Sequence, residues 1–108
     1  MPRRYRVVIL DRARRDIENA FGYIFFELSN PIAAYATYDG IISKIRSLET
    51  FPSGYSTLDI GPWSGMGYRK VHYKNYTIIY KVDETKELVV ITNVIYSHRD
   101  FSAIRPLP

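Results

Sequence analysis

The stretch from Tyr68 to Asp100 constrains the fold more than any other part of the chain. It contains three runs rich in β-branched and aromatic residues, separated by short polar breaks at residues 74–75 and 83–87. Runs joined by such short breaks pair as antiparallel neighbours, so the stretch predicts a three-stranded meander. Both histidines of the chain, His72 and His98, fall in it, and neighbouring strands can bring them close together.

Upstream of the meander, the pattern predicts a short strand over residues 5–10 and two amphipathic helices over residues 12–29 and 31–51. Asp11 is expected to cap the first helix, and Asn30 followed by Pro31 the second. Apolar residues recur every three or four positions in both helices and should be buried: Ile17, Phe21, Ile24 and Leu28 in the first, and Ala34, Tyr38, Ile41, Ile45 and Leu48 in the second.

The resulting order is β-α-α-β-β-β in a single domain spanning residues 1–108. This is an α+β fold, in which an antiparallel or mixed sheet carries the helical hairpin on one face and leaves the other face partly open. Gly40 is expected to allow the two helices to approach closely, and Pro52 to end the second helix. Trp63 should anchor the loop over residues 53–67 to the core. The tail from Phe101 onward should be extended or frayed.

The net charge and the kinds of basic residue indicate which classes of partner the chain could bind. The net charge is +4, and ten of the fifteen basic residues are arginine, which suits phosphate and carboxylate groups. This charge is compatible with a nucleic acid or an acidic protein as the partner, and equally with a soluble domain that happens to be basic. The chain has no cysteine, and two histidines alone do not make a ligand set, so we expect no metal and no cofactor. No signal peptide or long apolar run is present, which predicts a cytoplasmic protein without membrane contact.

Several short segments, taken in order, resemble the RelE/ParE superfamily of bacterial type II toxin–antitoxin toxins. The resemblance covers nearly the whole chain and implies a small growth-inhibiting toxin, associated with plasmid stabilization, that a cognate antitoxin holds inactive. The segments that carry it are Asn30-Pro31-Ile32-Ala33-Ala34, Leu48-Glu49-Thr50-Phe51-Pro52, Gly67-Tyr68-Arg69-Lys70, Asn75-Tyr76 with Tyr80, and Ser97-His98-Arg99-Asp100.

The superfamily divides by target. RelE-like members cut mRNA on the ribosome as metal-independent endoribonucleases, whereas ParE-like members inhibit DNA gyrase without catalysis. Cleavage needs an acid, a base and cations around one phosphate, and histidine is the natural acid or base near neutral pH. If the protein is a nuclease, its catalytic residues are His72, His98 and Arg99, and its substrate-binding residues are Arg69, Lys74, Tyr76 and Tyr96.

Two departures from the nuclease pattern keep other interpretations open. Asn75 stands where similar nucleases carry an aspartate, and Thr77 where RelE-like members carry an arginine. Strand alternation also puts Arg69 and His72 on opposite faces unless a bulge intervenes. Each histidine has a structural alternative as well: His72 as an exposed strand residue, and His98 as a hydrogen-bonded cap. The sequence favours ribosome-dependent mRNA cleavage, with gyrase inhibition or a non-toxic family member as alternatives.

Overall fold

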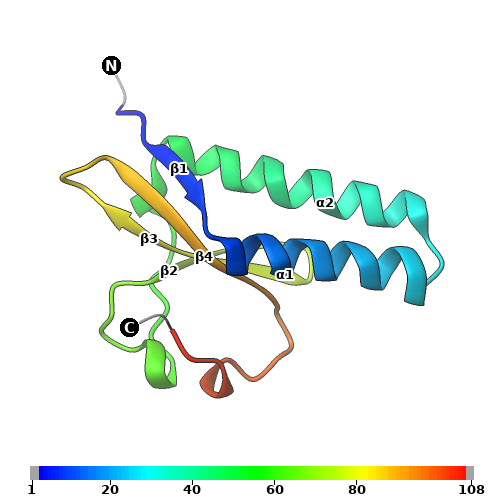
Figure 1. Ribbon diagram of the computed structural model, residues 1–108. Coiled ribbons are helices and arrows are strands. Elements are labelled where there is room, and N and C mark those ends of the chain that lie inside the picture. The colour runs from blue at the N-terminus through cyan, green and yellow to red at the C-terminus, as the bar shows by residue number, and fades with distance from the viewer. Residues whose placement is uncertain (1–2, 107–108) are drawn as a thin grey trace.

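The computed structural model describes residues 3–106 and contains a four-stranded mixed sheet packed against two helices (Figure 1). The strand order is β1-β4-β3-β2, with β1 parallel to β4 and the other two pairs antiparallel. The α+β class, the β-α-α-β-β-β order and the meander are therefore confirmed. The strands are β1 (Arg6–Ile9), β2 (Arg69–Tyr73), β3 (Tyr76–Asp83) and β4 (Leu88–Tyr96).

The first helix, α1 (Asp11–Gly22), continues into a π-helical turn, Tyr23–Glu27. The predicted N-cap at Asp11 is wrong, because α1 begins at that residue and Leu10 occupies the cap position without a side-chain hydrogen bond. The Asp11 carboxylate lies in the first turn instead, where the helix dipole favours a negative charge.

The second helix, α2 (Pro31–Arg46), begins as predicted. The Asn30 side chain accepts a hydrogen bond from the backbone N of Ala33 at 3.1 Å, and Pro31 occupies the first turn. The helix ends earlier than expected, followed by a 3-10 turn over Ser47–Glu49. Pro52 therefore does not end α2; it begins a separate 3-10 turn, Pro52–Gly54.

Both helices cover the same face of the sheet. Their buried residues pack against strand residues in one apolar cluster, which includes Ala13, Ile17, Ile41, Ile45, Val71, Ile78, Tyr80, Val89 and Ile91. Two expected members of the helical stripes are exposed, Leu28 at 55% and Tyr38 at 40%, and a third, Phe21, is half-buried. The reason is that the hairpin extends past the edge of the sheet, so its far end has no strands beneath it (Figure 1).

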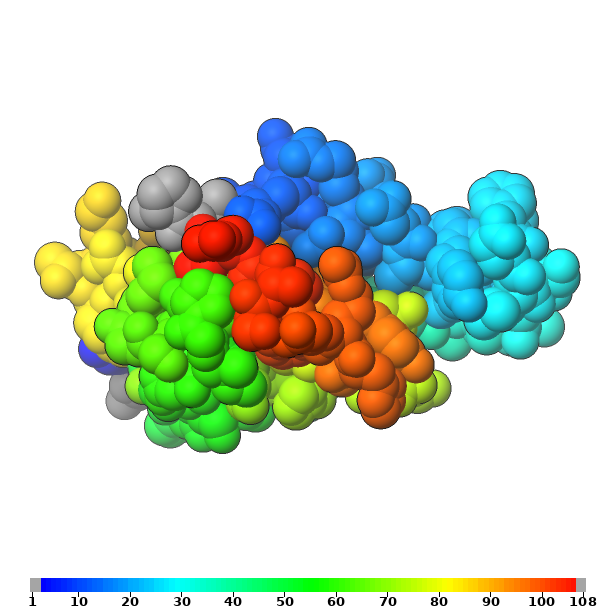
Figure 2. Space-filling view, turned by 90° about the horizontal axis from the view of Figure 1, so that it is seen from below, coloured from blue at the N-terminus to red at the C-terminus, as the bar shows by residue number. Residues whose placement is uncertain are grey.

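The opposite face is covered rather than partly open. The 53–67 loop and the segment after β4 lie over it, as Figure 2 shows from below. Trp63 is fully buried, meets Tyr68 edge to face, and donates from Nε1 to the carbonyl of Phe101 at 3.0 Å, so the predicted anchor is confirmed. The predicted extended tail is wrong at Phe101–Ala103, which form a 3-10 turn; residues 107–108 lie outside the described part. Phe101 and Ile104 are part-buried against a second apolar cluster on this face, which explains why the segment folds back. The cluster consists of Leu58, Trp63, Tyr68, Ile79 and Ile95.

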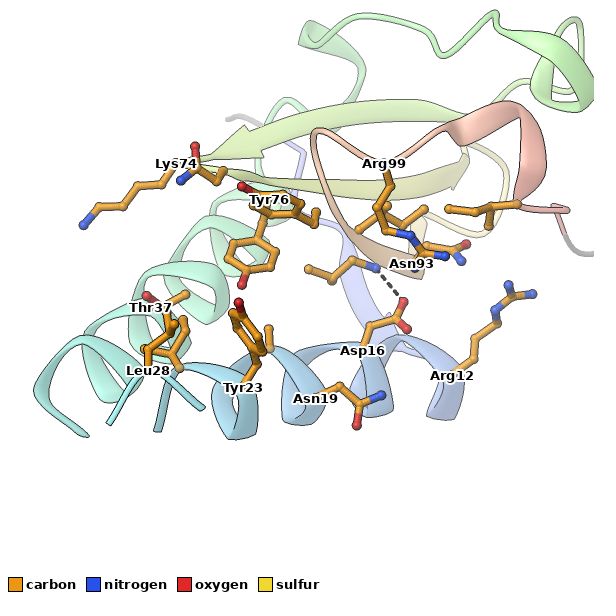
Figure 3. A pocket seen from close by; sticks show the side chains of 17 residues that line it. Arg12, Asp16, Asn19, Tyr23, Leu28, Thr37, Lys74, Tyr76, Asn93 and Arg99 are labelled. Atoms are coloured by element: carbon orange, nitrogen blue, oxygen red, sulfur yellow. Dashed lines mark hydrogen bonds between the residues drawn. The ribbon is translucent and has the colours of Figure 1, made fainter. Parts of the chain in front are cut away.

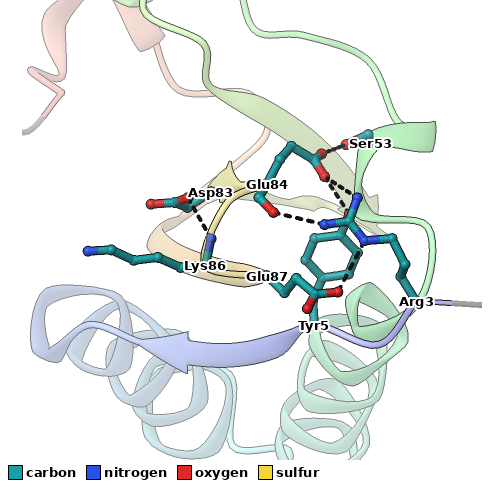
Figure 4. Close-up of polar contacts among 7 residues, drawn as sticks. All are labelled: Arg3, Tyr5, Ser53, Asp83, Glu84, Lys86 and Glu87. Atoms are coloured by element: carbon teal, nitrogen blue, oxygen red, sulfur yellow. Dashed lines mark hydrogen bonds and ion pairs between the residues drawn. The ribbon is translucent and has the colours of Figure 1, made fainter.

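A polar cluster fastens the N-terminal segment to the turn between β3 and β4 (Figure 4). Arg3 donates to the side chains of Glu84 and Glu87, and the Tyr5 hydroxyl donates to Glu84 at 2.5 Å. Ser53 donates to the other oxygen of Glu84 at 2.8 Å, which adds the loop after α2. The ion pairs are exposed and each contributes little, but together with buried Tyr5 they hold β1 beside β4.

Gly40 makes room for a strand residue, not for α1 as the sequence predicted. A Cβ atom at Gly40 would lie 1.9 Å from Cζ of Tyr73, on β2. The Tyr73 ring is part-buried against the helix-side cluster, so it can pack against α2 only because residue 40 has no side chain.

The Gly40→Ala variant should therefore unfold more easily than wild type, although alanine is the better helix former. We expect a loss of about 1–3 kcal/mol in urea unfolding, because the added methyl group displaces the Tyr73 ring. Gly22→Ala is the matched control, since nothing lies within 4 Å of its added Cβ, and it should be neutral or stabilising by up to about 1 kcal/mol. Equal effects of the two changes would contradict this account of Gly40.

Candidate functional site

A groove lies beside the second half of β4. The strand β1 pairs with β4 only along Leu88–Ile91, so the remainder of β4 has no strand on that side. The helix α1 runs next to this free edge, and the space between them is a groove of about 910 Å³. One oxygen of Asp16 accepts a hydrogen bond from the backbone N of Val94 at 2.9 Å (Figure 3). The carboxylate thus takes the place of the carbonyl that a neighbouring strand would offer.

The groove combines cationic and aromatic side chains. Among residues 3–106, none of its three cations forms an ion pair with a carboxylate. The rings of Tyr76 and Tyr96 meet edge to face, with centroids 5.8 Å apart, and Tyr23 points toward Tyr76 from the π-helical turn (Figure 3). The cations are Arg12, Lys74 and Arg99, and the aromatic residues are Tyr23, Tyr76 and Tyr96.

In the described part of the chain, Asp16 is the one carboxylate that lines this groove. Burial raises the pKa of Asp16 above the ordinary carboxyl value, whereas the Val94 hydrogen bond and the charges of Arg12, Arg99 and Arg15 oppose that rise. The groove thus holds more positive than negative charge at neutral pH, which suits an anionic ligand or partner.

Five of the predicted site residues lie together at this end of the sheet. Lys74, Tyr76, Tyr96 and Arg99 line the groove, and the ring of His98 lies 5.2 Å from that of Tyr96, measured between centroids. Their roles in binding or catalysis remain predictions, but their grouping agrees with a common site.

The other two predicted residues lie elsewhere. The pairing of β2 with β3 is regular, without a bulge, so Arg69 and His72 lie on opposite faces as strand alternation predicts. Arg69 donates to the backbone carbonyl of Tyr55 at 2.6 Å and does not line the groove. Nδ1 of His72 lies 3.0 Å from the hydroxyl oxygen of buried Thr77, on the face away from the helices.

Sequence reasoning missed the contribution of α1 to the groove. Arg12, Asp16, Asn19 and Tyr23 follow one another at spacings of four, three and four, and all line the groove. This polar stripe has the same period as the apolar stripe that identified the helix, so it could have been found. The partnership of Thr77 with His72 could not, because it depends on the register of β2 against β3.

A change of Asp16 to asparagine should alter how stability depends on pH. Because the pKa of Asp16 is raised in the folded protein, the protonated side chain favours folding and the ionised one opposes it. This contribution is present below the ordinary carboxyl pKa and is lost as the pH rises through the folded value. The free energy of unfolding of wild type minus that of Asp16→Asn should therefore fall as the pH rises from the ordinary carboxyl pKa toward neutral.

Asp59→Asn provides the opposite case. Hydrogen bonds from the Thr57 hydroxyl and the backbone N of Gly65 lower the pKa of Asp59, so its contribution is present above the ordinary carboxyl pKa and is lost on acidification. Urea unfolding from acidic to neutral pH should give differences of opposite slope for the two variants, the Asp59 slope lying below the ordinary carboxyl pKa and the Asp16 slope above it. Slopes of the same sign would show that burial does not raise the pKa of Asp16.

Comparison with known proteins identifies the family. The family model described as "ParE toxin of type II toxin-antitoxin system, parDE" matches residues 7–101. No curated protein matches the chain. Within residues 3–106, no helix is long and apolar enough to cross a membrane.

Two solved structures share the fold. One, titled a chromosomal ParDE toxin–antitoxin system from P. aeruginosa, has a TM-score of 0.71 at 13% identity, covering 87% of this chain and 97% of the other. The other, the toxin–antitoxin complex RelBE2 from Mycobacterium tuberculosis, has a TM-score of 0.60 at 19% identity, covering 86% and 91%. With the family match spanning most of its length, the chain belongs to the ParE toxin family of type II toxin–antitoxin systems, within the RelE/ParE superfamily.

Proposed function

We propose that this protein is a toxin that a cognate antitoxin neutralises, and that it arrests growth by binding DNA gyrase rather than by cutting RNA. The observation that carries the choice is the separation of the groups that cleavage requires. Arg69 binds the Tyr55 carbonyl on one face of the sheet, and His72 binds Thr77 on the other.

Cleavage of RNA through its 2′-hydroxyl requires an acid, a base and a cation around a single phosphate. His72 has Thr77, a neutral residue, as its hydrogen-bonded partner, at the position where RelE-like members carry an arginine. Asn75 likewise provides no carboxylate in the turn before β3. Inhibition by binding needs none of these groups, so the arrangement supports a ParE-like mode of action.

The far end of the helical hairpin supports an antitoxin as the partner. Large apolar side chains are exposed there, on the part that projects past the sheet (cyan in Figure 2). A monomeric protein rarely gathers this many exposed large apolar side chains in one region, and the apolar face of an amphipathic partner helix commonly packs on such side chains. The net charge of +4 favours an acidic segment. The exposed side chains of this hairpin patch are Tyr23, Phe26, Leu28, Ile32, Tyr35 and Tyr38.

Replacement of Phe26 or Ile32 by serine should weaken antitoxin binding without affecting the fold. These side chains are 73% and 84% exposed, so their loss should change the free energy of unfolding by less than about 0.5 kcal/mol. If they are central to the interface, the affinity for the antitoxin encoded beside the gene should fall at least about tenfold in calorimetry. Ile60→Ser is the control, because Ile60 is 47% exposed on the loop before Trp63, outside the hairpin patch. Unchanged binding by both hairpin variants would remove this surface from the interface.

Expression without antitoxin should stop DNA replication before protein synthesis, and broken gyrase–DNA complexes should accumulate. Under the gyrase proposal, His72→Ala and His98→Ala should remain as toxic as wild type, since neither imidazole performs chemistry. Pulse labelling of DNA and of protein after induction measures the order of events, and linearised plasmid reports the breaks.

Ribosome-dependent mRNA cleavage is the second candidate, and the groove favours it. Tyrosine rings beside arginine and lysine side chains that form no ion pair within residues 3–106 suit single-stranded RNA, through stacking and phosphate contacts. His98 lies next to Tyr96 at the end of this groove. If translation stops first, mRNA is cut at defined codons and His98→Ala abolishes toxicity, this candidate replaces the gyrase proposal.

A further inference from the structure

Three side chains form a hydrogen-bonded chain across the sheet, on the face away from the helices. Nδ1 of His72 on β2 lies 3.0 Å from Oγ1 of Thr77 on β3, and the same Oγ1 lies 2.8 Å from Oγ of Ser97, just after β4. Thr77 is fully buried, Ser97 is half-buried and His72 is exposed. The chain therefore begins at an imidazole in solvent and passes through a hydroxyl that solvent does not reach.

A chain of this kind has a direction, because each hydroxyl carries a single proton. When Nδ1 is unprotonated, Thr77 donates to His72 and can accept from Ser97. When the imidazole is doubly protonated, Nδ1–H is a donor, so Thr77 accepts from it and its own proton is free to be donated to Ser97. The Ser97 hydroxyl then accepts from Thr77 and its own proton is free to point outward.

We infer that His72, Thr77 and Ser97 form a proton-controlled switch, in which the charge on His72 determines whether Ser97 donates into the sheet or outward to an anionic acceptor. Thr77 is the positioning residue, since it connects two groups from non-adjacent strands. The inference does not depend on how the toxin acts.

The group whose hydrogen bonding would change is the Ser97 hydroxyl, which lies in the segment that leads from β4 to the candidate site. The backbone N of Ser97 donates to the Asn75 carbonyl at 2.7 Å, which fixes the residue against the turn between β2 and β3. The next residues, His98 and Arg99, lie beside and within the groove. An outward hydroxyl proton at Ser97 would add a donor for an anionic oxygen at this end of the sheet.

The charges around His72 are mostly positive. Lys70 shares its face of β2, Lys74 follows in the turn, and Lys81 lies farther along the Thr77 face of β3. From the segment after β4, His98 and Arg99 follow Ser97. Within residues 3–106, His72 has no ion pair with a carboxylate, and the Thr77 hydroxyl is the side-chain hydrogen-bond partner of its Nδ1.

The switch can be tested by NMR on the intact protein in a His98→Gln background, which removes the other titrating imidazole next to Ser97. Histidine changes charge between about pH 5 and about pH 8, so the His72 ring signals are followed across that range. The Ser97 side-chain ¹³Cβ signal should show a transition with the same midpoint as the His72 ring. In Thr77→Val, which removes the hydroxyl, His72 should still titrate but the Ser97 transition should disappear. In Thr77→Ser, which keeps the hydroxyl, the transition should return.

Two outcomes would overturn the inference. The first is a Ser97 signal that stays flat in the His98→Gln protein while the His72 ring titrates. The second is a Ser97 transition that keeps its amplitude in Thr77→Val, because Ser97 would then sense the charge of His72 through space. The amide spectrum of each variant shows whether the fold is intact. If Thr77→Val does not fold, Ser97→Ala replaces it, and the Thr77 methyl signal is the readout. The pH transition of that signal should shrink, because Ser97 can no longer accept a hydrogen bond from Thr77, and an unchanged amplitude would overturn the inference.

Discussion

The parallel pairing of β1 with β4 determines much of this molecule, because β1 is four residues long and β4 is nine. The second half of β4 has no neighbouring strand on one side, and its backbone N–H and C=O groups there still need hydrogen-bond partners. The chain leaves β1 directly into α1, which carries Asp16 to the edge and supplies an acceptor for Val94. The Asp16 side chain satisfies one backbone N–H group but occupies less space than a neighbouring strand would, and the space left over is the groove. The candidate site is thus a consequence of a short first strand.

A single extra residue determines which side chains of β4 reach the groove. The pairing of β3 with β4 shifts between Ile79 and Tyr80, where Thr92 is unmatched, and Thr92 donates to the carbonyl of Ile79 at 3.3 Å. A bulge of this kind reverses the alternation of the strand beyond it. Ile91 before the bulge and Val94 after it therefore belong to the same helix-side cluster. Tyr96 follows Val94 in this alternation, which directs it toward Tyr76 and the groove.

The sequence predicted those parts of the fold that local chemistry decides. The meander, the Asn30 cap and the buried Trp63 each follow from side chains acting within a few residues or from their need to be buried. Features that depend on distant segments were missed. The exposure of Tyr38 depends on where the sheet ends, and the Gly40 contact depends on Tyr73 reaching α2. Of the predicted site residues, Lys74, Tyr76, Tyr96, His98 and Arg99 lie in one region, although their roles stay predictions. The register of β2 against β3 places Arg69 and His72 away from them.

The projecting hairpin has a consequence for the free protein in solution. The helices α1 and α2 are held by their packing on the sheet, so the exposed apolar side chains at the end of the hairpin have no core to pack into. Burial of this apolar surface therefore favours association of two free copies of the protein, and the associated fraction rises with protein concentration. A partner that covers this surface would remove this cause of association. An excess of free chain would be limited by self-association as well as by capture.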